Sequence, residues 1–345
     1  MATIKDVAKA AGLAISTVSA VINRSAPVSE DAIKRVGQAI DTVGYIANGA
    51  ARSLRSGKSS LIGLLVPNVA NPIFGAVARE VEHFCFERGY TSVVFSTGQD
   101  ADRESQILRM LRMHRVGGLL IIPTRSDAKH GASLKSMIHV PTVLLDMYVD
   151  GLPFDVVKTD NVEAGRLAAE HLIALGHRRI GIIVGIPGLA TSDDRLAGYI
   201  QAHRAAGVPR DPTLIVAGRF VTDTAYQAAL GLIDRPDRPT AIVTISNLMS
   251  VGLLFAVKER KLRLPQDLSI VGIDDLDIAE LLDPVPTVVA TPVIGMASRA
   301  IEMLLAEIEN GVPPAGKREI WKPKLIQRGS AAAHLDFPHG EILRS

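Results

Sequence analysis

Cysteine, aromatic residues and long apolar runs are all scarce in this chain of 345 residues. The single cysteine, Cys85, excludes a disulfide framework within the chain, which fits a reducing cytoplasm. No apolar run approaches the ~20 residues that a membrane-spanning helix needs, and no apolar signal segment follows Met1. We therefore expect a cytoplasmic protein without a membrane partner. Aromatic residues make up 4% of the chain and hydrophobic residues 47%, so small aliphatic side chains must form its core.

Sequence motifs for catalysis or metal binding are also missing. The nine histidines lack HExxH spacing, and no Gly-x-Ser-x-Gly, P-loop or dinucleotide fingerprint occurs. His177 lies in an expected helix-to-strand turn, where a structural role is favoured. We therefore expect no enzyme activity, no cofactor and no metal. A protein controlled by a ligand needs only different affinities in two conformations.

Positive charge is concentrated at the N-terminus. Residues 1–60 contain eight Lys and Arg residues against four Asp and Glu residues, a net charge of +4. The whole chain carries +2, so residues 61–345 carry −2. A basic excess confined to one segment is typical of contact with nucleic-acid phosphates.

Three short helices are expected in this basic segment. Apolar residues at positions 4, 7, 8 and 11 predict the first, with Thr3 as its N-cap and Gly12 at its end. The second is expected over residues 15–23, and the third runs from the N-cap Ser29 to Gly44. Many small bundles share this pattern, so charge is what favours DNA binding. We expect the second and third helices to bury Val18, Val21, Ile22, Ile33, Val36 and Ile40.

Residues 48–57 predict a two-turn helix that is capped by Asn48 and ended by Gly57. Such a short helix is marginal in water and needs DNA and a partner to form. The alternative is a flexible linker that contains a stray Leu54.

From residue 61 onward, apolar strands alternate with helices. Strands are expected at 61–67, 92–95, 118–122, 143–146 and 156–159, with helices at 72–88 and 103–114 but none between 122 and 143. The alternation restarts with a helix at 161–176, and a further strand is expected near 319–326. This pattern predicts a doubly wound α/β architecture with two similar lobes around a cleft. In such sheets, ligands bind outside the carboxyl ends of the strands.

The N-terminal segment resembles the LacI/GalR family of bacterial transcription regulators. The motifs that carry the resemblance are Thr3-Ile4-x-Asp6-Val7-Ala8, Gly12, Thr17-Val18-Ser19-x-Val21-Ile22-Asn23, Gly44-Tyr45 and Ala51-Arg52-Ser53-Leu54. It extends to residue 330 through Asn71-Pro72-x-Phe74, Arg195-x-x-Gly198-Tyr199, Asp274-Asp275 and Arg328-Gly329-Ser330. The resemblance implies an all-α helix-turn-helix DNA-binding head and an α/β two-lobed core like a periplasmic sugar-binding protein.

The resemblance also implies how the head reads DNA. Residues 15–23 become the recognition helix in the major groove, and the hinge helices of a homodimer enter the minor groove, where Leu54 is the wedge that kinks the duplex. Three positions depart from the family: Ala14 lacks the usual Ser cap, Ala20 replaces a polar base-reading residue, and Ala47 replaces a common Pro. Specificity is therefore expected to depend partly on DNA deformability. The expected DNA contacts are Thr3, Ile15, Ser16, Thr17, Ser19, Ala20, Asn23, Asn48, Ala51, Arg52, Leu54 and Arg55.

Arg195 and Asp274 match the family's cleft residues, and a guanidinium and a carboxylate can clamp adjacent sugar hydroxyls. A surface ion pair without a ligand is the alternative. Phe74 and Phe220 match ring-stacking positions but are also candidates for core packing. Asn247 matches a binding Asn, although Leu248 replaces the Asp that often follows it. Asp146 and Asp160-Asn161 are further candidates that also suit turns and caps. The expected effector contacts are Ile73, Phe74, Asp146, Arg195, Phe220, Asn247 and Asp274.

The expected boundaries follow from these patterns. We place a DNA-binding domain at 1–46, a hinge at 47–60, a two-lobed core at 61–330 and a tail at 331–345. The N-lobe would comprise 61–159 and 291–318, and the C-lobe 160–290 and 319–330.

We expect a homodimeric repressor that binds a near-palindromic double-stranded operator and responds to a sugar or sugar derivative. One alternative is a purine-type corepressor with the same DNA role. The other is a ligand-binding protein whose head contacts protein instead of DNA, and the hinge motif argues against it.

Overall fold

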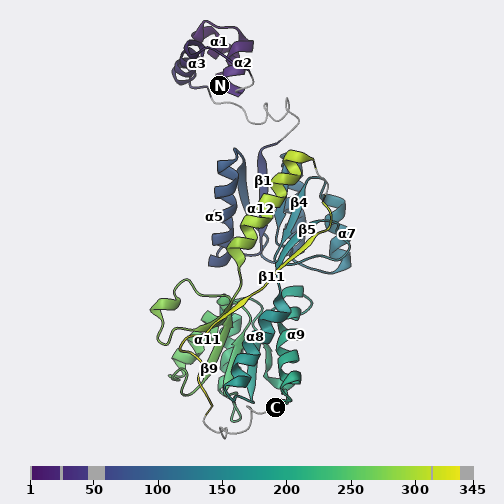
Figure 1. Ribbon diagram of the computed structural model, residues 1–345, viewed down its shortest axis with the longest axis vertical. Coiled ribbons are helices and arrows are strands. Elements are labelled where there is room, and N and C mark those ends of the chain that lie inside the picture. Colours follow the sequence, from purple (N-terminus) through teal and green to yellow (C-terminus); the bar gives the residue numbers. More distant parts are fainter. Residues whose placement is uncertain (1, 24–25, 46–58, 312–313, 335–345) are drawn as a thin grey trace, which may run out of the picture. The chain divides into compact units, whose positions relative to one another are not determined.

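A computed structural model of the chain describes residues 2–23, 26–45, 59–311 and 314–334 (Figure 1). Contacts between residues divide the chain into two compact units, Met1–Ser60 and Leu61–Ser345. The smaller unit is the head and the larger is the core. Among the described residues, no helix has both the length and the apolar character needed to span a membrane.

The head consists of three helices: α1 (Ile4–Ala11), α2 (Ile15–Asn23) and α3 (Glu30–Val43). The backbone N–H and the hydroxyl of Thr3 both donate to the Asp6 carboxylate at 2.8 Å, which fixes the start of α1. Gly12 ends α1 with a φ of 62°, a left-handed conformation that suits glycine. The Arg35 guanidinium donates to the Ala11 carbonyl through Nε at 3.1 Å and Nη2 at 2.7 Å, which ties α3 to this turn.

The hydrophobic core of the head does not include every residue that the sequence predicts for it. Val7, Val18 and Val36 are fully buried, together with Ala8, Ala11, Ala32 and Ala39. The expected core residue Ile33 is instead 50% exposed. The buried stripe of α3 follows positions 32, 36 and 39, and Ile33 lies about 100° around the helix from Ala32. The prediction that Ile33 belongs to the core was therefore wrong.

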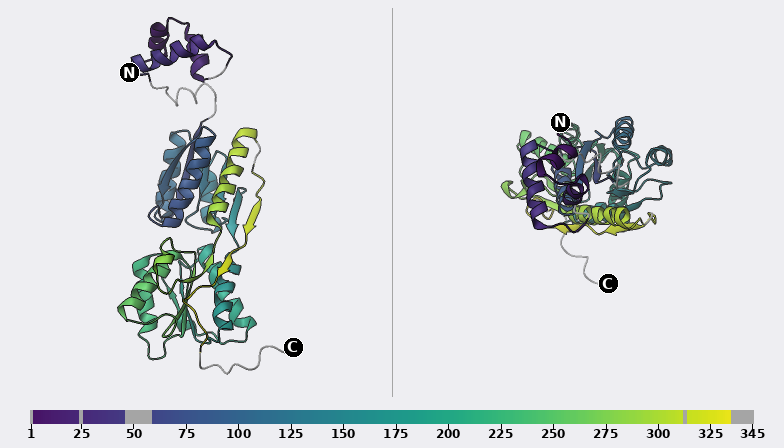
Figure 2. Two further views of the ribbon diagram at one scale, coloured as in Figure 1. Left: turned by 60° about the vertical axis from the view of Figure 1, so that its left-hand side comes forward. Right: turned by 90° about the horizontal axis from the view of Figure 1, so that it is seen from above.

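The core contains two six-stranded sheets, one in each lobe (Figure 2). The N-lobe sheet is parallel throughout. Its order is β11 (Arg318–Trp321), β5 (Asp155–Thr159), β4 (Thr142–Leu145), β3 (Gly118–Ile121), β1 (Leu61–Val66) and β2 (Thr91–Ser96). The C-lobe sheet is parallel except for its first strand, which pairs antiparallel with the second. Its order is β12 (Lys324–Ile326), β10 (Thr287–Ala290), β9 (Ser269–Ile273), β8 (Ala241–Thr244), β6 (Ile180–Val184) and β7 (Ile215–Ala217).

Helices cover the faces of both sheets. The N-lobe carries α5 (Pro72–Glu87), α6 (Ala101–Met113), α7 (Ala128–Met137) and α12 (Val293–Asn310). The C-lobe carries α8 (Asn161–Ala174), α9 (Ala190–Ala205), α10 (Thr222–Ile233) and α11 (Asn247–Glu259), with short 3₁₀ turns at Pro212–Leu214 and Ala279–Leu281. The α5 and α12 helices pack on one face of the N-lobe sheet, around Val77, Val81 and Leu304.

The chain passes three times between the lobes, after β5, after β10 and between β11 and β12. The third passage lies between Trp321 and Lys324, because β11 belongs to the N-lobe sheet and β12 to the C-lobe sheet. The N-lobe boundary expected at residue 318 falls at the first residue of β11 instead of after its last. The single strand expected near residues 319–326 is therefore two short strands in different sheets.

Two glycines bring α8 and α9 into backbone contact. A Cβ on Gly165 would lie 1.8 Å from the Arg195 carbonyl oxygen, and one on Gly198 would lie 1.9 Å from the Val162 carbonyl oxygen. No side chain fits at either position. This close approach fixes the part of α9 that carries Arg195.

Glu307 on α12 is a buried acid without an ion-pair partner among the described residues. It is 6% exposed, and neither carboxylate oxygen makes a hydrogen bond of normal geometry with a described residue. Burial and the nearby Asp155 charge raise the pKa of Glu307 to about 7. The Asp155 carboxylate is occupied by the backbone N–H groups of Ala315 and Lys317, at 3.0 and 2.8 Å.

This acid predicts a pH-dependent stability. The folded-state pKa lies above the ordinary value of 4.5, so the folded state retains a proton that the unfolded state releases. The free energy of unfolding should therefore fall as pH rises from about 4.5 to above 7. Over that pH range, the free energy of unfolding of the parent should fall by about 1–3 kcal/mol more than that of Glu307→Gln. Urea unfolding at several pH values would measure the difference, with the exposed Glu309→Gln as the control. A constant difference between parent and Glu307→Gln would contradict the assignment.

Candidate functional site

A cavity of about 190 Å³ lies in the core and is lined by residues of both lobes. The carboxyl ends of strands in both sheets open onto it, which is where doubly wound sheets bind ligands. Such a volume is below the ~300–1,000 Å³ of sites for drug-sized molecules, so it suits a small ligand. The polar residues of its lining are Asn68, Asn71, Gln99, Asp146, Thr191, Arg195, Ser246, Asn247, Asp274 and Thr291.

Arg195 on α9 is 4% exposed and held by three acceptors. Its Nε donates to Asn161 Oδ1 at 2.8 Å. Its Nη1 donates to the Ile245 carbonyl at 2.6 Å and to Asp274 Oδ2 at 3.1 Å. Its Nη2 makes no hydrogen bond with any described residue, so this group is available to a ligand in the cavity.

Asp146 and Asp274 occupy matching places in the two lobes. Asp146 follows β4 with a φ of 71°, and Asp274 follows β9 with a φ of 68°. Asp tolerates this left-handed conformation better than most residues. Each backbone N–H donates at 2.9 Å to the neighbouring strand, at the Val157 and Val289 carbonyls. The two lobes therefore present one carboxylate each to the cavity.

The surroundings of these two carboxylates differ. Asp274 accepts hydrogen bonds from Arg195 and from the Thr291 hydroxyl, the latter at 2.5 Å. Asp146 has only a long contact of 3.5 Å from the Thr191 hydroxyl. Burial raises the pKa of Asp146, and the Asp274 charge adds to this effect while Arg195 opposes it. Asp146 is therefore the carboxylate with acceptor capacity left for a ligand.

Two asparagines join the lobes across the cavity. Asn247 Nδ2 donates to Asn71 Oδ1 at 2.8 Å, and Asn71 Nδ2 donates to Asn247 Oδ1 at 3.3 Å. Both side chains are buried, and both lie at the start of a helix, α5 or α11. This reciprocal pair satisfies both amides only when the lobes are close together.

We expect this asparagine pair to stabilise the arrangement in which the lobes are close together. Replacing Asn71 with alanine leaves the Asn247 amide buried without its partner, at a cost of about 1–3 kcal/mol to the closed arrangement. We expect the radius of gyration of Asn71→Ala in X-ray scattering to exceed that of the parent. Asn68→Ala, which removes a neighbouring asparagine of the lining, is the control. Identical scattering of parent and Asn71→Ala would show that the pair does not hold the lobes.

Two phenylalanines complete the lining. Phe74 lies in the first turn of α5 and also packs against the N-lobe core. Phe220 has a φ of 59°, and its ring lies so close to Gly185 that a Cβ there would be 2.2 Å from it. Both rings therefore contribute to the cavity and to core packing, the two alternatives that the sequence left open.

All seven expected effector residues line this one cavity. Their part in binding stays a prediction.

Of the further pair, Asp160 and Asn161, Asp160 accepts from the Glu163 N–H and caps α8, whereas Asn161 is buried against Arg195. Thr191 and Thr291, whose hydroxyls contact the two carboxylates, were not expected from the sequence. His177 has the expected structural environment, between the Thr240 hydroxyl and the Ala332 carbonyl, and burial lowers its pKa to about 4.

In the head, the α2 residues that are expected to contact DNA differ in exposure, and their contact with DNA stays a prediction. Ile15 is 46% exposed and Ser16 is exposed, while Thr17, Ser19 and Ala20 are half-buried. Asn23 is the last residue of α2, and Thr3 is exposed at the start of α1. The remaining expected contacts lie outside the described residues: Asn48, Ala51, Arg52, Leu54 and Arg55. No group of three or more side chains suited to a metal ion occurs in the described ranges.

Known proteins match both units of the chain. Residues 3–48 match the bacterial regulatory proteins of the lacI family, and residues 169–331 match a periplasmic binding protein-like domain. A structure of the lac repressor dimer bound to operator and the anti-inducer ONPF has a TM-score of 0.85. At 24% identity, covering 96% of this chain and 99% of that one, it supports the fold alone.

Two repressors are similar over nearly the whole length. The HTH-type transcriptional repressor PurR of Vibrio atlanticus (strain LGP32) is 34% identical over 310 residues, covering 90% of this chain and 93% of that protein. The ribose operon repressor of Escherichia coli (strain K12) is 34% identical over 331 residues, covering 96% and 100%. These matches confirm the expectation of a DNA-binding regulator rather than an enzyme. The chain belongs to the lacI family of bacterial regulatory proteins.

Proposed function

We propose that this regulator represses transcription and that a small polar effector in the cavity between the lobes sets its affinity for operator DNA. The observation that carries the proposal is the buried Arg195, which is fixed by three acceptors and retains a free Nη2 beside Asp146 and Asp274. Residues of both lobes line this cavity, so a ligand there has different affinities for open and closed arrangements. Such a difference is what shifts a conformational equilibrium.

The effector we favour is a sugar or sugar derivative of monosaccharide size. Carboxylates accept from hydroxyls and a guanidinium donates to them, so this site suits a ring with several adjacent hydroxyls. Phe74 and Phe220 offer apolar faces for the ring carbons. The similarity to a ribose operon repressor supports this choice. A purine-type corepressor is the second candidate, because PurR proteins are similar over nearly the whole chain.

A thermal-shift screen of pentoses, hexoses and nucleobases separates these candidates. A bound effector stabilises the folded core by RT ln(1 + [L]/Kd), so at equal concentrations the tighter ligand gives the larger rise in melting temperature. We expect a sugar to give the largest shift and to weaken operator binding. A shift from nucleobases alone, together with tighter operator binding, would establish the corepressor instead.

For the DNA side, we propose a homodimer in the cytoplasm that binds a near-palindromic operator. Residues 1–46 form the DNA-binding domain, 47–60 the hinge, 61–330 the core and 331–345 a tail. The exposed Ile15 and Ser16 offer a methyl contact to thymine and a hydroxyl to base edges. With alanine at position 20, part of the specificity falls to the hinge and to DNA bending.

Leu54→Ala tests the hinge. If Leu54 inserts between base steps, its loss should reduce both DNA bending and specific affinity. Effector binding should stay at the parental level, because the cavity lies in the core. Gel-phasing assays measure the bend. Equal bending by parent and variant would show that Leu54 is not the wedge.

A further inference from the structure

A second cavity of about 320 Å³ lies in the C-lobe and shares no residue with the cavity between the lobes. It lies at the amino end of β6, beside the loop that follows α9. Ligands of doubly wound sheets bind at the opposite, carboxyl ends, so the proposed effector site does not explain this cavity. Its lining consists of Arg178, Arg179, Ile180, His203, Pro209, Arg210, Asp211 and Leu214.

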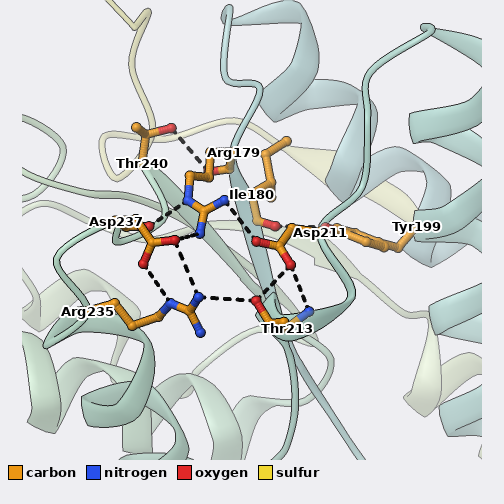
Figure 3. Close-up of polar contacts among 8 residues, drawn as sticks. All are labelled: Arg179, Ile180, Tyr199, Asp211, Thr213, Arg235, Asp237 and Thr240. Atoms are coloured by element: carbon orange, nitrogen blue, oxygen red, sulfur yellow. Dashed lines mark hydrogen bonds and ion pairs between the residues drawn. The ribbon is translucent and has the colours of Figure 1, made fainter.

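On one side of this cavity, Arg179 and Asp211 belong to a network of ion pairs and hydrogen bonds (Figure 3). Arg179 donates to Asp211 at 2.9 Å through Nη1 and to Asp237 at 2.5 Å through Nη2. Asp211 in turn accepts from the backbone N–H and the hydroxyl of Thr213, at 2.9 and 2.7 Å. Arg235 donates to both Asp237 and Thr213. Arg179 and Asp211 therefore neutralise one another and form a preorganised wall.

The remaining charge of the lining is positive. Three guanidiniums and one carboxylate line the cavity, a net charge of +2 before His203 is counted. Arg178 donates to the Ile173 and His177 carbonyls through Nη1 at 3.0 and 3.1 Å, which holds its guanidinium in place. Arg210 is exposed and has no hydrogen bond or ion pair within the described part of the chain. A guanidinium without a carboxylate partner suits the paired oxygens of a phosphate group.

His203 contributes a hydrogen-bond acceptor to the lining of this cavity. It is 3% exposed, and its ring packs against Tyr199 with 4.5 Å between centroids. Its Nδ1 lies 3.3 Å from the Val208 carbonyl, which places the proton on Nδ1. Its Nε2 is buried and makes no hydrogen bond with a described residue. Burial lowers the pKa of His203, so the ring is neutral near pH 7 and Nε2 carries a lone pair.

We propose that this cavity is a second ligand site that binds a singly protonated phosphate group, either free hydrogen phosphate or a phosphate monoester. The anionic oxygens would bind the Arg210 guanidinium. The P–OH group would donate to His203 Nε2, a buried acceptor that has no partner among the described residues. Sulfate has the same shape but carries no proton near neutral pH, so it cannot make this bond. The site therefore discriminates phosphate from sulfate.

Titration calorimetry of the full chain tests this site. Inorganic phosphate, glycerol 3-phosphate and sodium sulfate would each be titrated at pH 6.5 in a zwitterionic buffer at constant ionic strength. We expect saturable 1:1 binding of phosphate and at least tenfold weaker binding of sulfate. Tighter binding of glycerol 3-phosphate than of phosphate identifies a monoester as the ligand, and the reverse identifies the free ion. Equal affinity for phosphate and sulfate, or no saturable binding, would overturn the proposal.

Two arginine variants locate the binding. Arg210→Ala breaks no hydrogen bond or ion pair within the described residues and should lower phosphate affinity at least tenfold. Arg204→Ala removes the same charge from an exposed position on the last turn of α9, outside the lining, and should keep the parental affinity. Equal losses in the two variants would show that general surface charge binds the anion, which contradicts a specific site in this cavity. Arg210→Ala should also keep the parental affinity for the cleft effector, so a failure here is distinct from a failure of the proposed function.

His203→Phe tests the acceptor. Phenylalanine keeps the ring packed on Tyr199 but has no lone pair for the P–OH group. We expect this variant to bind phosphate and sulfate within about twofold of one another, with its folding checked by thermal melting. Retained discrimination in a folded variant would exclude His203 from the site. If the variant does not fold, the Arg210 and Arg204 pair still decides the proposal.

Discussion

Arg195→Ala is expected to bind operator like the parent in the absence of effector and to lose its response to effector. Arg195 supplies the free Nη2 of the cavity and holds Asp274 through Nη1. Its removal leaves polar groups of the effector unpaired and takes the Arg195 donor from Asp274 Oδ2, while Oδ1 keeps the Thr291 hydroxyl. Each buried group left unpaired costs about 1–3 kcal/mol. The expected loss of effector affinity is about ten- to a hundredfold. Calorimetry with the effector identified by the thermal-shift screen measures it.

Asp274→Asn separates charge from shape at the same place. The amide retains one oxygen for Thr291 or Arg195 but removes the negative charge, so effector affinity should fall while the fold is kept. Exposed Arg204→Ala on α9 controls for the loss of an arginine. For an inducer, both cleft variants repress permanently; for a corepressor, both leave transcription permanently on. Parental effector affinity in Arg195→Ala and Asp274→Asn would remove these residues from the site.

Gly165→Ala is expected to destabilise the C-lobe strongly. The new Cβ would lie 1.8 Å from the Arg195 carbonyl oxygen and 2.7 Å from its carbonyl carbon, so α9 must move away from α8. Overpacking against backbone cannot be relieved by a rotamer change. We expect a loss of about 3 kcal/mol or more in the free energy of unfolding. Effector affinity should fall with it, because Arg195 is displaced from Asn161 and Asp274.

Gly231→Ala on α10 is the matched control. A Cβ there would have no atom within 4 Å, so this change should raise stability by about 0.5–1 kcal/mol through helix propensity. Urea unfolding of the parent and both variants measures these differences. Equal stability of the Gly165 and Gly231 variants would show that α8 and α9 do not approach as closely as described.

The sequence predicted elements best where a local pattern decides the structure. The apolar run from residue 61 forms β1, and Ser29 caps α3 by accepting from the Ala32 N–H. Where the local signals are weak, the prediction from sequence failed. The α7 helix was missed because its ten residues include Gly131 and lack a strong apolar stripe. Ile33 was misplaced because one helical position separates it from the buried face.

In the candidate site, too, some residues could be predicted from the sequence and others could not. Arg195 and Asp274 could be predicted because each occurs in a recognisable motif at a helix start or a strand end. The Asn71–Asn247 pair could not, since its members are 176 residues apart and meet only when the lobes do. Asn247 was expected to contact the effector, yet both functional groups of its side chain already bond to Asn71. Tertiary contacts of this kind leave no recognisable spacing pattern in the sequence.

The central claim is that ligand binding between the lobes controls operator affinity through Arg195. Its most direct test is fluorescence anisotropy with labelled operator at fixed salt, with and without effector, for the parent and Arg195→Ala. The parent is predicted to change its operator affinity at least tenfold on saturation with effector, whereas Arg195→Ala is predicted to show no change at the same effector concentration. An equal change in both proteins, or an effector that binds the parent without altering its operator affinity, would contradict the account.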